Sequence, residues 1–152
     1  MLSDRLDPES VRTPLASTRK NEILRELSEI LAEGAGVPDR AGEILEAILK
    51  REALLSTGIG HGVALPHAKC SCLSRPAMAV GTTSEPVDFD AVDGAPVDLV
   101  WMLAGPERTA GHHVRTLAAV SELLRNESVR ASLSGAATPG EFIARVAEAE
   151  SA

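Results

Sequence analysis

The chain has 152 residues, a length that fits one domain and is short for two ordinary ones. Hydrophobic residues make up 44% and charged residues 24%, the balance of a folded globular domain rather than of a disordered tail. A net charge of −7 makes the chain a poor match for nucleic acid or anionic lipid. Its aromatic residues, Phe89, Trp101 and Phe142, are too few for a base-stacking platform.

The sequence holds no segment suited to membrane insertion or export. The longest strongly apolar stretch, Leu99–Ala104, is far shorter than the ~20 residues that span a bilayer. Residues 1–21 contain acidic side chains and no apolar core, unlike a secretory signal. Cys70 and Cys72 are one residue apart, and a bridge between them would close a small, strained ring. We therefore expect two reduced thiols in a cytoplasmic protein.

The first part of the chain predicts two helices after a short strand. Residues 11–16 are expected to form an edge strand, whose pairing a proline restricts. A helix capped by Ser17 or Thr18 runs to about Glu33, because its apolar residues recur on one face. A second helix, opened by a proline, covers residues 38–54.

The middle of the chain predicts strands around a glycine-rich loop. Residues 56–62 read STGIGHG, with three glycines in seven residues, and are expected to form a tight loop outside any regular element. Short apolar runs predict strands at 63–65, 77–82 and 87–91, the last followed by an Asp-Gly turn. The most apolar run, 97–103, is expected to be a central, buried strand.

Helices dominate the last part of the sequence. One is predicted over 112–125, with Val114, Leu117, Ala118, Val120 and Leu124 as candidate buried positions, and a short one over 128–133. The run Thr138-Pro139-Gly140-Glu141 predicts a capping box that opens a final helix. Since helices and strands interleave, the fold class is α/β, a single domain over 1–152 with helices covering a small sheet. Residues 1–4 and 150–152 are expected to be loose ends.

Reactive polar side chains gather in two places. One is the stretch from Arg51 to Cys72, and the other is the pair His112 and His113 with Arg115, at the start of a helix. A helix N-terminus offers free backbone N–H groups to an anion. Histidines at a strand end and at a helix start, with an arginine beside a glycine loop, would suit the handling of a phosphoryl group.

These segments resemble a known family. Residues 51–67 read REALLSTGIGHGVALPH and resemble the active-site segment of type-2 enzyme IIA domains of the bacterial phosphotransferase system, approximately RE…STGIGNGIAIPH. This is the fructose/mannitol and nitrogen-regulatory class. Residues 97–100 resemble its PVDL strand, and 113–117 its second-histidine helix. The resemblance implies a mixed, mainly parallel sheet of about five strands flanked by helices on both faces.

The resemblance also implies a function. His67 would accept a phosphoryl group from phospho-HPr and pass it to a cysteine of a IIB domain, or signal by its phosphorylation state to a regulatory target. His113 and Arg51 would stabilise the phosphoryl group. Neutral imidazole both attacks and leaves readily near neutral pH, and a guanidinium fork suits two phosphoryl oxygens. Loop support is expected from Gly58, Gly60, Gly62 and Pro66, with no cofactor and no metal.

Some features depart from the family pattern and leave alternatives open. His61 replaces the usual Asn, and both tolerate positive φ, so the loop is expected to persist with a third titratable ring near the site. His112 adjoins His113, which leaves open which ring faces His67. A metal module built on His61, His67, Cys70 and Cys72 is a rival reading, disfavoured by the one-residue cysteine spacing.

The mode of action also allows a second reading. A regulator that binds targets without phosphorylation is a further alternative, although His67, Arg51 and His113 are all present. The sequence does not specify a sugar, nor a transport or a regulatory role. Because no HPr, IIB or membrane segment is fused, the expectation leans toward the regulatory branch or a separate-subunit permease. An acidic rim of Glu85, Asp88, Asp90 and Asp93 is expected around the docking face of His67.

Overall fold

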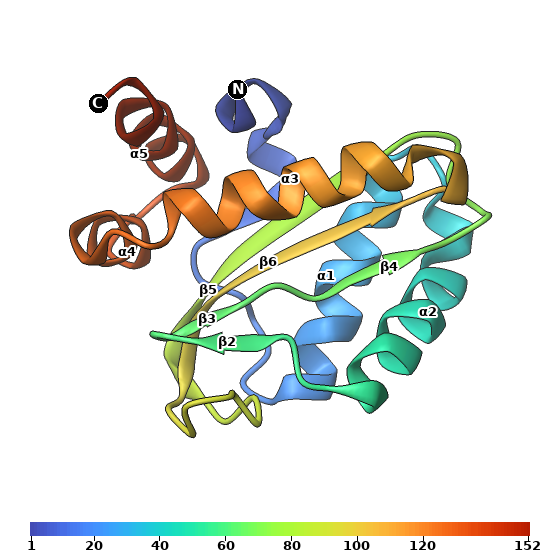
Figure 1. The fold of residues 1–152 in the computed structure, drawn as a ribbon, viewed down its shortest axis with the longest axis horizontal. Helices are drawn as coiled ribbons and strands as arrows, with labels where there is room; N and C mark the ends of the chain where they lie inside the picture. Colours follow the sequence, from blue (N-terminus) through green and yellow to red (C-terminus); the bar gives the residue numbers. More distant parts are fainter.

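The computed structural model describes residues 1–152 and shows one mixed sheet between two layers of helices (Figure 1). The sheet has six strands in the order β1-β5-β6-β3-β2, with β4 also paired to β6. Their bounds are β1 Val11–Arg12, β2 Gly58–Gly60, β3 Val63–Ala64, β4 His67–Lys69, β5 Ala77–Val87 and β6 Val97–Gly105. The expected mixed sheet is confirmed, with one strand more than the expected five.

Strand β6 is the centre of the sheet, as its apolar sequence predicts. It pairs antiparallel with β5 and parallel with β3 and β4, and the remaining pairs are β1–β5, parallel, and β2–β3, antiparallel. Side chains alternate along β6, so that Val100 and Met102 enter one core while Trp101 and Leu103 enter the other. A strand buried on both faces reads as a continuous apolar run for this reason.

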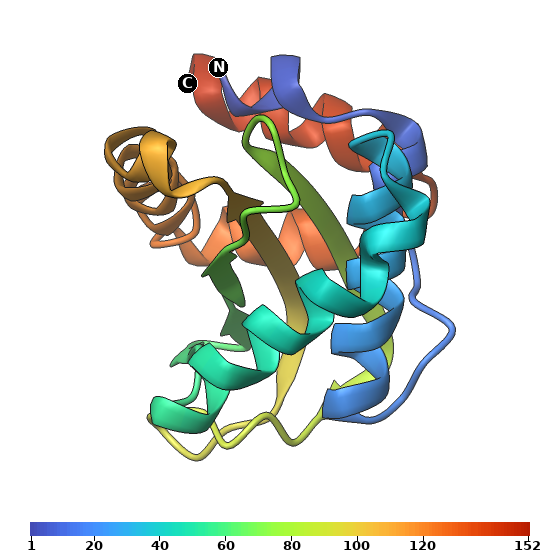
Figure 2. The same cartoon turned by 90° about the vertical axis from the view of Figure 1, so that its right-hand side faces the viewer.

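Helices cover both faces of the sheet (Figure 2). Helices α1 (Lys20–Gly34) and α2 (Ala41–Leu54) pack on one face, and α3 (Ala110–Leu123), α4 (Glu127–Ser134) and α5 (Pro139–Ser151) pack on the other. Single turns of 3-10 helix lie at Leu2–Arg5, Pro8–Ser10, Pro38–Arg40 and Glu107–Thr109. None of the helices combines the length and the apolar composition needed to cross a membrane.

Several element predictions need correction. Neither Ser17 nor Thr18 caps α1; its N-cap is Arg19, which makes no side-chain cap bond. The expected separate strand at 87–91 is absent, because β5 continues to Val87 through an irregular register opposite β6. The glycine segment 56–62 is only partly a loop, since it contains the strand β2. Glycines are poor strand formers, and here tertiary pairing with β3 overrides that preference.

The predicted start of α5 is confirmed, but the predicted buried face of α3 is only partly right. Thr138 caps α5 through its hydroxyl, as expected, while Glu141 reaches back to the backbone N–H of Ala137 rather than to that of Thr138. In α3, Val120 is buried, but Val114 and Ala118 are exposed. The helix turns the face of His113 and Thr116 to the sheet instead.

The chain ends, expected to be loose, are held against each other. The Glu150 carboxylate accepts hydrogen bonds from the backbone N–H groups of Leu2, at 3.0 Å, and Ser3, at 2.8 Å. Leu2 is buried and Asp4 pairs with the N-terminal amine. The first residues therefore form part of the packed layer beside α5, which Figure 1 shows next to both termini.

Candidate functional site

His67 begins β4 directly after the short strand β3, beside the C-terminal half of β6. Its ring is half-buried, and Nδ1 lies 2.7 Å from the carbonyl oxygen of Leu65. A carbonyl oxygen only accepts hydrogen bonds, so Nδ1 carries the proton and Nε2 keeps its lone pair. The intervening Pro66 is fixed as well, because its carbonyl accepts from the backbone N–H of Leu103 at 2.9 Å.

A line of buried polar contacts holds the Leu65 backbone in place. The N–H of Leu65 donates to the carbonyl of Thr57 at 2.9 Å. Thr57 donates to the Glu52 carboxylate from both its backbone N–H and its hydroxyl, the latter at 2.7 Å. Glu52, whose side chain is 6% exposed, also pairs with Lys20 at 2.9 Å. The orientation of the His67 ring thus depends on an ion pair between α1 and α2.

His113 is the histidine that faces His67. It lies near the start of α3, is 7% exposed, and has its ring centroid 5.6 Å from that of His67, with the two planes tilted by 54°. His112 instead accepts a hydrogen bond at Nε2 from Arg5, at 2.9 Å. The geometry of α3 therefore shows that His113, and not the adjacent His112, faces His67.

An open cavity of about 740 Å³ joins these residues. Besides His67 and His113, its lining carries the cationic side chains of Lys50, Arg51 and Lys69 and two glutamates of α2, Glu43 and Glu46. The apolar lining comes from α2, α3 and the segment of β4, namely Ala47, Ala68, Cys70, Val114 and Leu117. Arg51 donates from Nη1 to the carbonyl of Leu55 at 2.8 Å, which leaves its other N–H groups available. Val114 is 64% exposed beside the two rings.

The pKa values of both facing histidines are lowered, which favours their neutral forms. Burial lowers the pKa of His67, and the charge of Arg51 adds to this, while the Leu65 hydrogen bond opposes it. Burial also lowers the pKa of His113, assisted by His67 and Lys69. A neutral His67 is available as a nucleophile, and a neutral His113 can donate one hydrogen bond.

The expected glycines divide: Gly58 pairs with Ala64 beside the Leu65 backbone, whereas Gly60 and Gly62 belong to a turn farther from His67. Gly60 and Gly62 have φ of +97° and +81°, and His61 between them has φ of +58°, so the left-handed turn persists with histidine in it. This turn contacts Asp93 and Asp98 rather than His67. Strand β3 is level with Leu99 of β6 while His67 is level with Leu103, roughly 13 Å farther along. His61 is therefore not a third ring beside His67.

The expected acidic rim is also wrong. None of Glu85, Asp88, Asp90 and Asp93 lines the cavity; Asp90 pairs with Lys20 at 3.5 Å, and Asp93 accepts from the backbone of His61 and Ala95. The rim instead carries charges of both signs. Four residues of the site, Lys50, Lys69, Glu52 and Thr57, had no predicted role, although the last two lie within the RE…STG segment.

The residues of the rival metal module do not assemble, because His61 lies away from the others. Atoms of Cys70, Cys72 and Glu43 do lie within 4.8 Å of one another, and both thiols are free. Glu43 is exposed and already pairs with Arg40. A structural zinc site closes with four ligands, and this cluster offers two sulfurs and one shared carboxylate. Burial and the neighbouring Cys70 raise the pKa of the Cys72 thiol to about 12, which favours the protonated form.

Comparison with known proteins decides the family. Residues 5–149 match the family model described as "Phosphoenolpyruvate-dependent sugar phosphotransferase system, EIIA 2". The chain belongs to the type-2 enzyme IIA family. The nitrogen regulatory protein of Bradyrhizobium diazoefficiens is 36% identical over 132 residues, covering 87% of this IIA chain and 85% of that protein.

Sugar-specific members of the IIA family are equally similar in sequence. The fructose-specific EIIABC component of Bacillus subtilis is 35% identical over 132 residues, which are 87% of this chain and 21% of that longer protein. Nitrogen regulatory protein IIA-Ntr from Neisseria meningitidis has a TM-score of 0.87 at 29% identity, covering 95% of this chain and 98% of that one. IIA mannitol from Escherichia coli has a TM-score of 0.77 at 23% identity over 93% of this chain and 98% of that one, and shares the fold.

Proposed function

We propose that this IIA protein is a cytoplasmic phosphocarrier whose acceptor atom is Nε2 of His67. The hydrogen bond from Nδ1 of His67 to the Leu65 carbonyl carries the proposal, because it leaves Nε2 as the free nucleophile. In the transfer, the bond between phosphorus and the donor's histidine nitrogen breaks as the Nε2–phosphorus bond forms. The donor expected from the family resemblance is phospho-HPr.

The surrounding side chains support this step by position and charge. A phosphoryl group in transfer spreads negative charge over three oxygens, so that fixed donors and cations around it lower the barrier. His113 would donate to one oxygen from the ring that faces His67. Arg51, on α2 and in the same cavity, would use N–H groups not bound to Leu55. Lys50 and Lys69 add positive charge at the mouth.

The acceptor would be a IIB domain or a regulatory target protein. Among solved structures, a complex of enzyme IIA mannitol and phosphorylated enzyme IIB mannitol from Escherichia coli has a TM-score of 0.78 at 22% identity. Relatives named for nitrogen regulation and for fructose transport match at nearly equal identity, 36% and 35%. Either acceptor would meet the exposed Val114 beside His67.

The deciding experiment is phosphorylation in vitro. The protein is incubated with enzyme I, HPr and phosphoenolpyruvate, and its intact mass is measured. The wild type is expected to gain one phosphoryl group that is labile in acid and stable in base. Heteronuclear NMR should show that this group is bonded to Nε2. His67→Ala should carry none while keeping the wild-type circular dichroism spectrum. Full labelling of His67→Ala would overturn the assignment.

The alternative of a binding protein that acts without phosphorylation makes the opposite forecast. A folded wild-type chain that gains no mass, beside a control IIA domain labelled in the same mixture, would favour it. The half-buried, neutral His67 with an oriented lone pair supports phosphorylation instead, since a simple binding surface has no need of that arrangement.

A further inference from the structure

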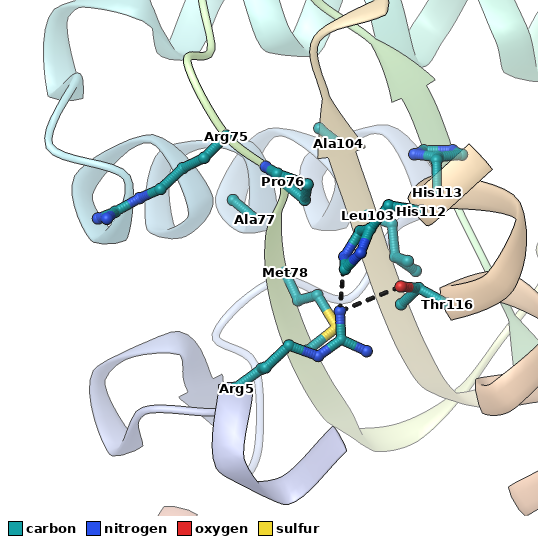
Figure 3. Close-up of a pocket in the computed structure, with 10 residues that line it drawn as sticks. All are labelled: Arg5, Arg75, Pro76, Ala77, Met78, Leu103, Ala104, His112, His113 and Thr116. Atoms are coloured by element: carbon teal, nitrogen blue, oxygen red, sulfur yellow. Dashed lines mark hydrogen bonds between the residues drawn. The ribbon is translucent and has the colours of Figure 1, made fainter. Parts of the chain in front are cut away.

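A second, smaller cavity lies on the other side of His113. Its volume is about 230 Å³, and it is enclosed by the N-terminal segment, the start of β5, the end of β6 and α3 (Figure 3). It is lined by Arg5, Arg75, Pro76, Ala77, Met78, Leu103, Ala104, His112, His113 and Thr116. His113 lines this cavity and also that of His67, so the two cavities share a wall.

The cavity has an apolar floor and an uncompensated positive charge. Met78 and Leu103 form part of the floor, and no acidic side chain lines the space. Arg5 donates from Nη1 to Nε2 of His112, at 2.9 Å, and to the hydroxyl of Thr116, at 3.0 Å, but forms no salt bridge. Figure 3 shows the Arg5 guanidinium directed at His112 and Thr116, whereas Arg75 extends away from them.

The charge of Arg5 affects the neighbouring His112. Burial lowers the pKa of His112, and the positive charges of Arg5 and Arg115 lower it further. Neutral His112 accepts from Arg5 through Nε2, so its proton resides on Nδ1. Arg5 therefore keeps N–H groups that bind neither His112 nor Thr116, and no carboxylate lines the cavity to neutralise its charge.

We propose that this second cavity binds a small monocarboxylate with a short apolar chain. The carboxylate would accept hydrogen bonds from Arg5, and the chain would lie over Met78 and Leu103. A phosphate ion matches the site less well, because it would give up its hydration against a largely apolar lining with one directed guanidinium. The volume is below the ~300–1,000 Å³ of drug-sized pockets, which restricts the ligand to a few carbons.

The test is a titration of the full-length, unphosphorylated chain with butyrate, followed by NMR of the histidine rings and methionine methyl groups. Saturable shifts of His112, His113 and Met78 are expected. The neutral analogue butyramide should bind at least tenfold more weakly, because it loses the charge-assisted hydrogen bond. Formate and inorganic phosphate should also bind more weakly, since neither fills the apolar floor.

A matched pair of variants separates the cavity from general attraction to arginine. Arg5→Gln should weaken butyrate binding about tenfold, whereas Arg12→Gln should leave it unchanged, since Arg12 bonds only to backbone carbonyls of its own segment. Shifts that do not saturate, or equal loss in both variants, would overturn the proposal. Phosphate binding as tightly as butyrate would overturn the monocarboxylate assignment. Because no phosphoryl transfer is measured, these outcomes are independent of the proposed function.

Discussion

His67 and His113 share one cavity but differ in what holds their rings. The Leu65 carbonyl binds Nδ1 of His67 at 2.7 Å and directs Nε2 outward. His113 is 7% exposed and has no hydrogen-bond partner of its own among the protein groups, so its ring is positioned by packing in α3. The His67 ring is therefore oriented for the nucleophilic role that we propose, and the His113 ring keeps an unused N–H for the phosphoryl oxygen that this role would bring.

Substitution of the two adjacent histidines of α3 should separate their roles. His113→Ala should still be phosphorylated on His67, but about 10²–10³-fold more slowly, which is the usual cost of losing one donor to a developing negative charge. His112→Ala should keep a rate near that of the wild type, because His112 faces Arg5. Rapid-quench phosphorylation by phospho-HPr measures both. A slow His112→Ala beside a fast His113→Ala would contradict the placement.

The buried histidines also predict how stability depends on pH. Burial lowers the pKa of His67, His112 and His113 in the folded state, whereas their unfolded value is ~6.5. As the pH drops below about 6.5 the unfolded chain binds more protons than the folded one, so the free energy of unfolding falls until the pH is below the folded pKa values, where it levels off. Urea midpoints should be lower at pH 5.5 than at 7.5, and the drop should be smaller in His113→Gln. An unchanged midpoint would refute this.

At the scale of elements, the site depends on contacts that connect α1, α2 and β3. Lys20 of α1 pairs with Glu52 of α2, which holds Thr57 and through it the backbone of Leu65. Lys20 and Glu52 lie 32 residues apart on different helices, whereas Thr57 and Leu65 lie in the loops before β2 and after β3. The resemblance marked Glu52 and Thr57, but only the fold shows what they bind.

Removing the Glu52 carboxylate should therefore affect both stability and the His67 ring. Glu52→Ala removes the acceptor of Thr57 and leaves Lys20 only its longer contacts with Asp90 and the Phe89 carbonyl, so it should lower the free energy of unfolding by about 3 kcal/mol, as expected when one member of a buried pair is lost. Glu46→Ala, which removes an exposed partner of Lys50, should cost under about 0.5 kcal/mol. Urea denaturation measures both, and equal costs would contradict the buried connection.

The glycine turn gives a second prediction at this scale. A Cβ at Gly58 would lie 2.9 Å from the backbone of Ala91, so Gly58→Ala should lower the urea midpoint. The rate of His67 phosphorylation should fall as well, because Gly58 follows Thr57 and pairs with Ala64, next to the Leu65 backbone that binds the His67 ring. Gly42→Ala in α2, where nothing lies within 4 Å, should instead stabilise by roughly 0.5–1 kcal/mol. An unchanged rate in Gly58→Ala would show that Gly58 gives the His67 site no support.

The sequence predicted element types well and their mutual positions less well. The apolar run of β6 and the Thr138 cap were readable because periodicity and capping are local properties. The position of the glycine turn was not, because it depends on the register of β3 and β4 against β6. His67 and His113 were predicted as partners through the resemblance; their 46-residue separation leaves no local signal.

At the scale of the whole molecule, charge and apolar exposure are distributed unequally. The chain carries a net charge of −7, yet Lys50, Arg51 and Lys69 line the His67 cavity. Val114 is exposed at its edge, while the other strongly exposed valine, Val92, lies in the turn between β5 and β6. Val114 is thus the strongly exposed apolar side chain that lines this cavity, and we expect it to contact a partner that docks at His67.

Substitution of Val114 should reduce productive docking without unfolding the protein. Val114→Ser should lower kcat/KM for transfer from phospho-HPr about tenfold, which is the scale of an apolar contact near an interface centre. Its urea midpoint should match that of the wild type, because the side chain is already 64% exposed. Val92→Ser is the control and should change neither quantity. Equal transfer by both variants would exclude Val114 from the docking surface.

The bonds from Leu2 and Ser3 to Glu150 make the chain nearly a closed ring. Any segment continuing from either end would leave the domain at the same place on its surface, so a flanking module would be attached there and would not cross the domain. Neither terminus lines the His67 cavity, so a flanking module would leave the cavity open to a partner. The same geometry suits a domain used alone and one carried within a longer polypeptide, as in the Bacillus subtilis relative of which it matches 21%.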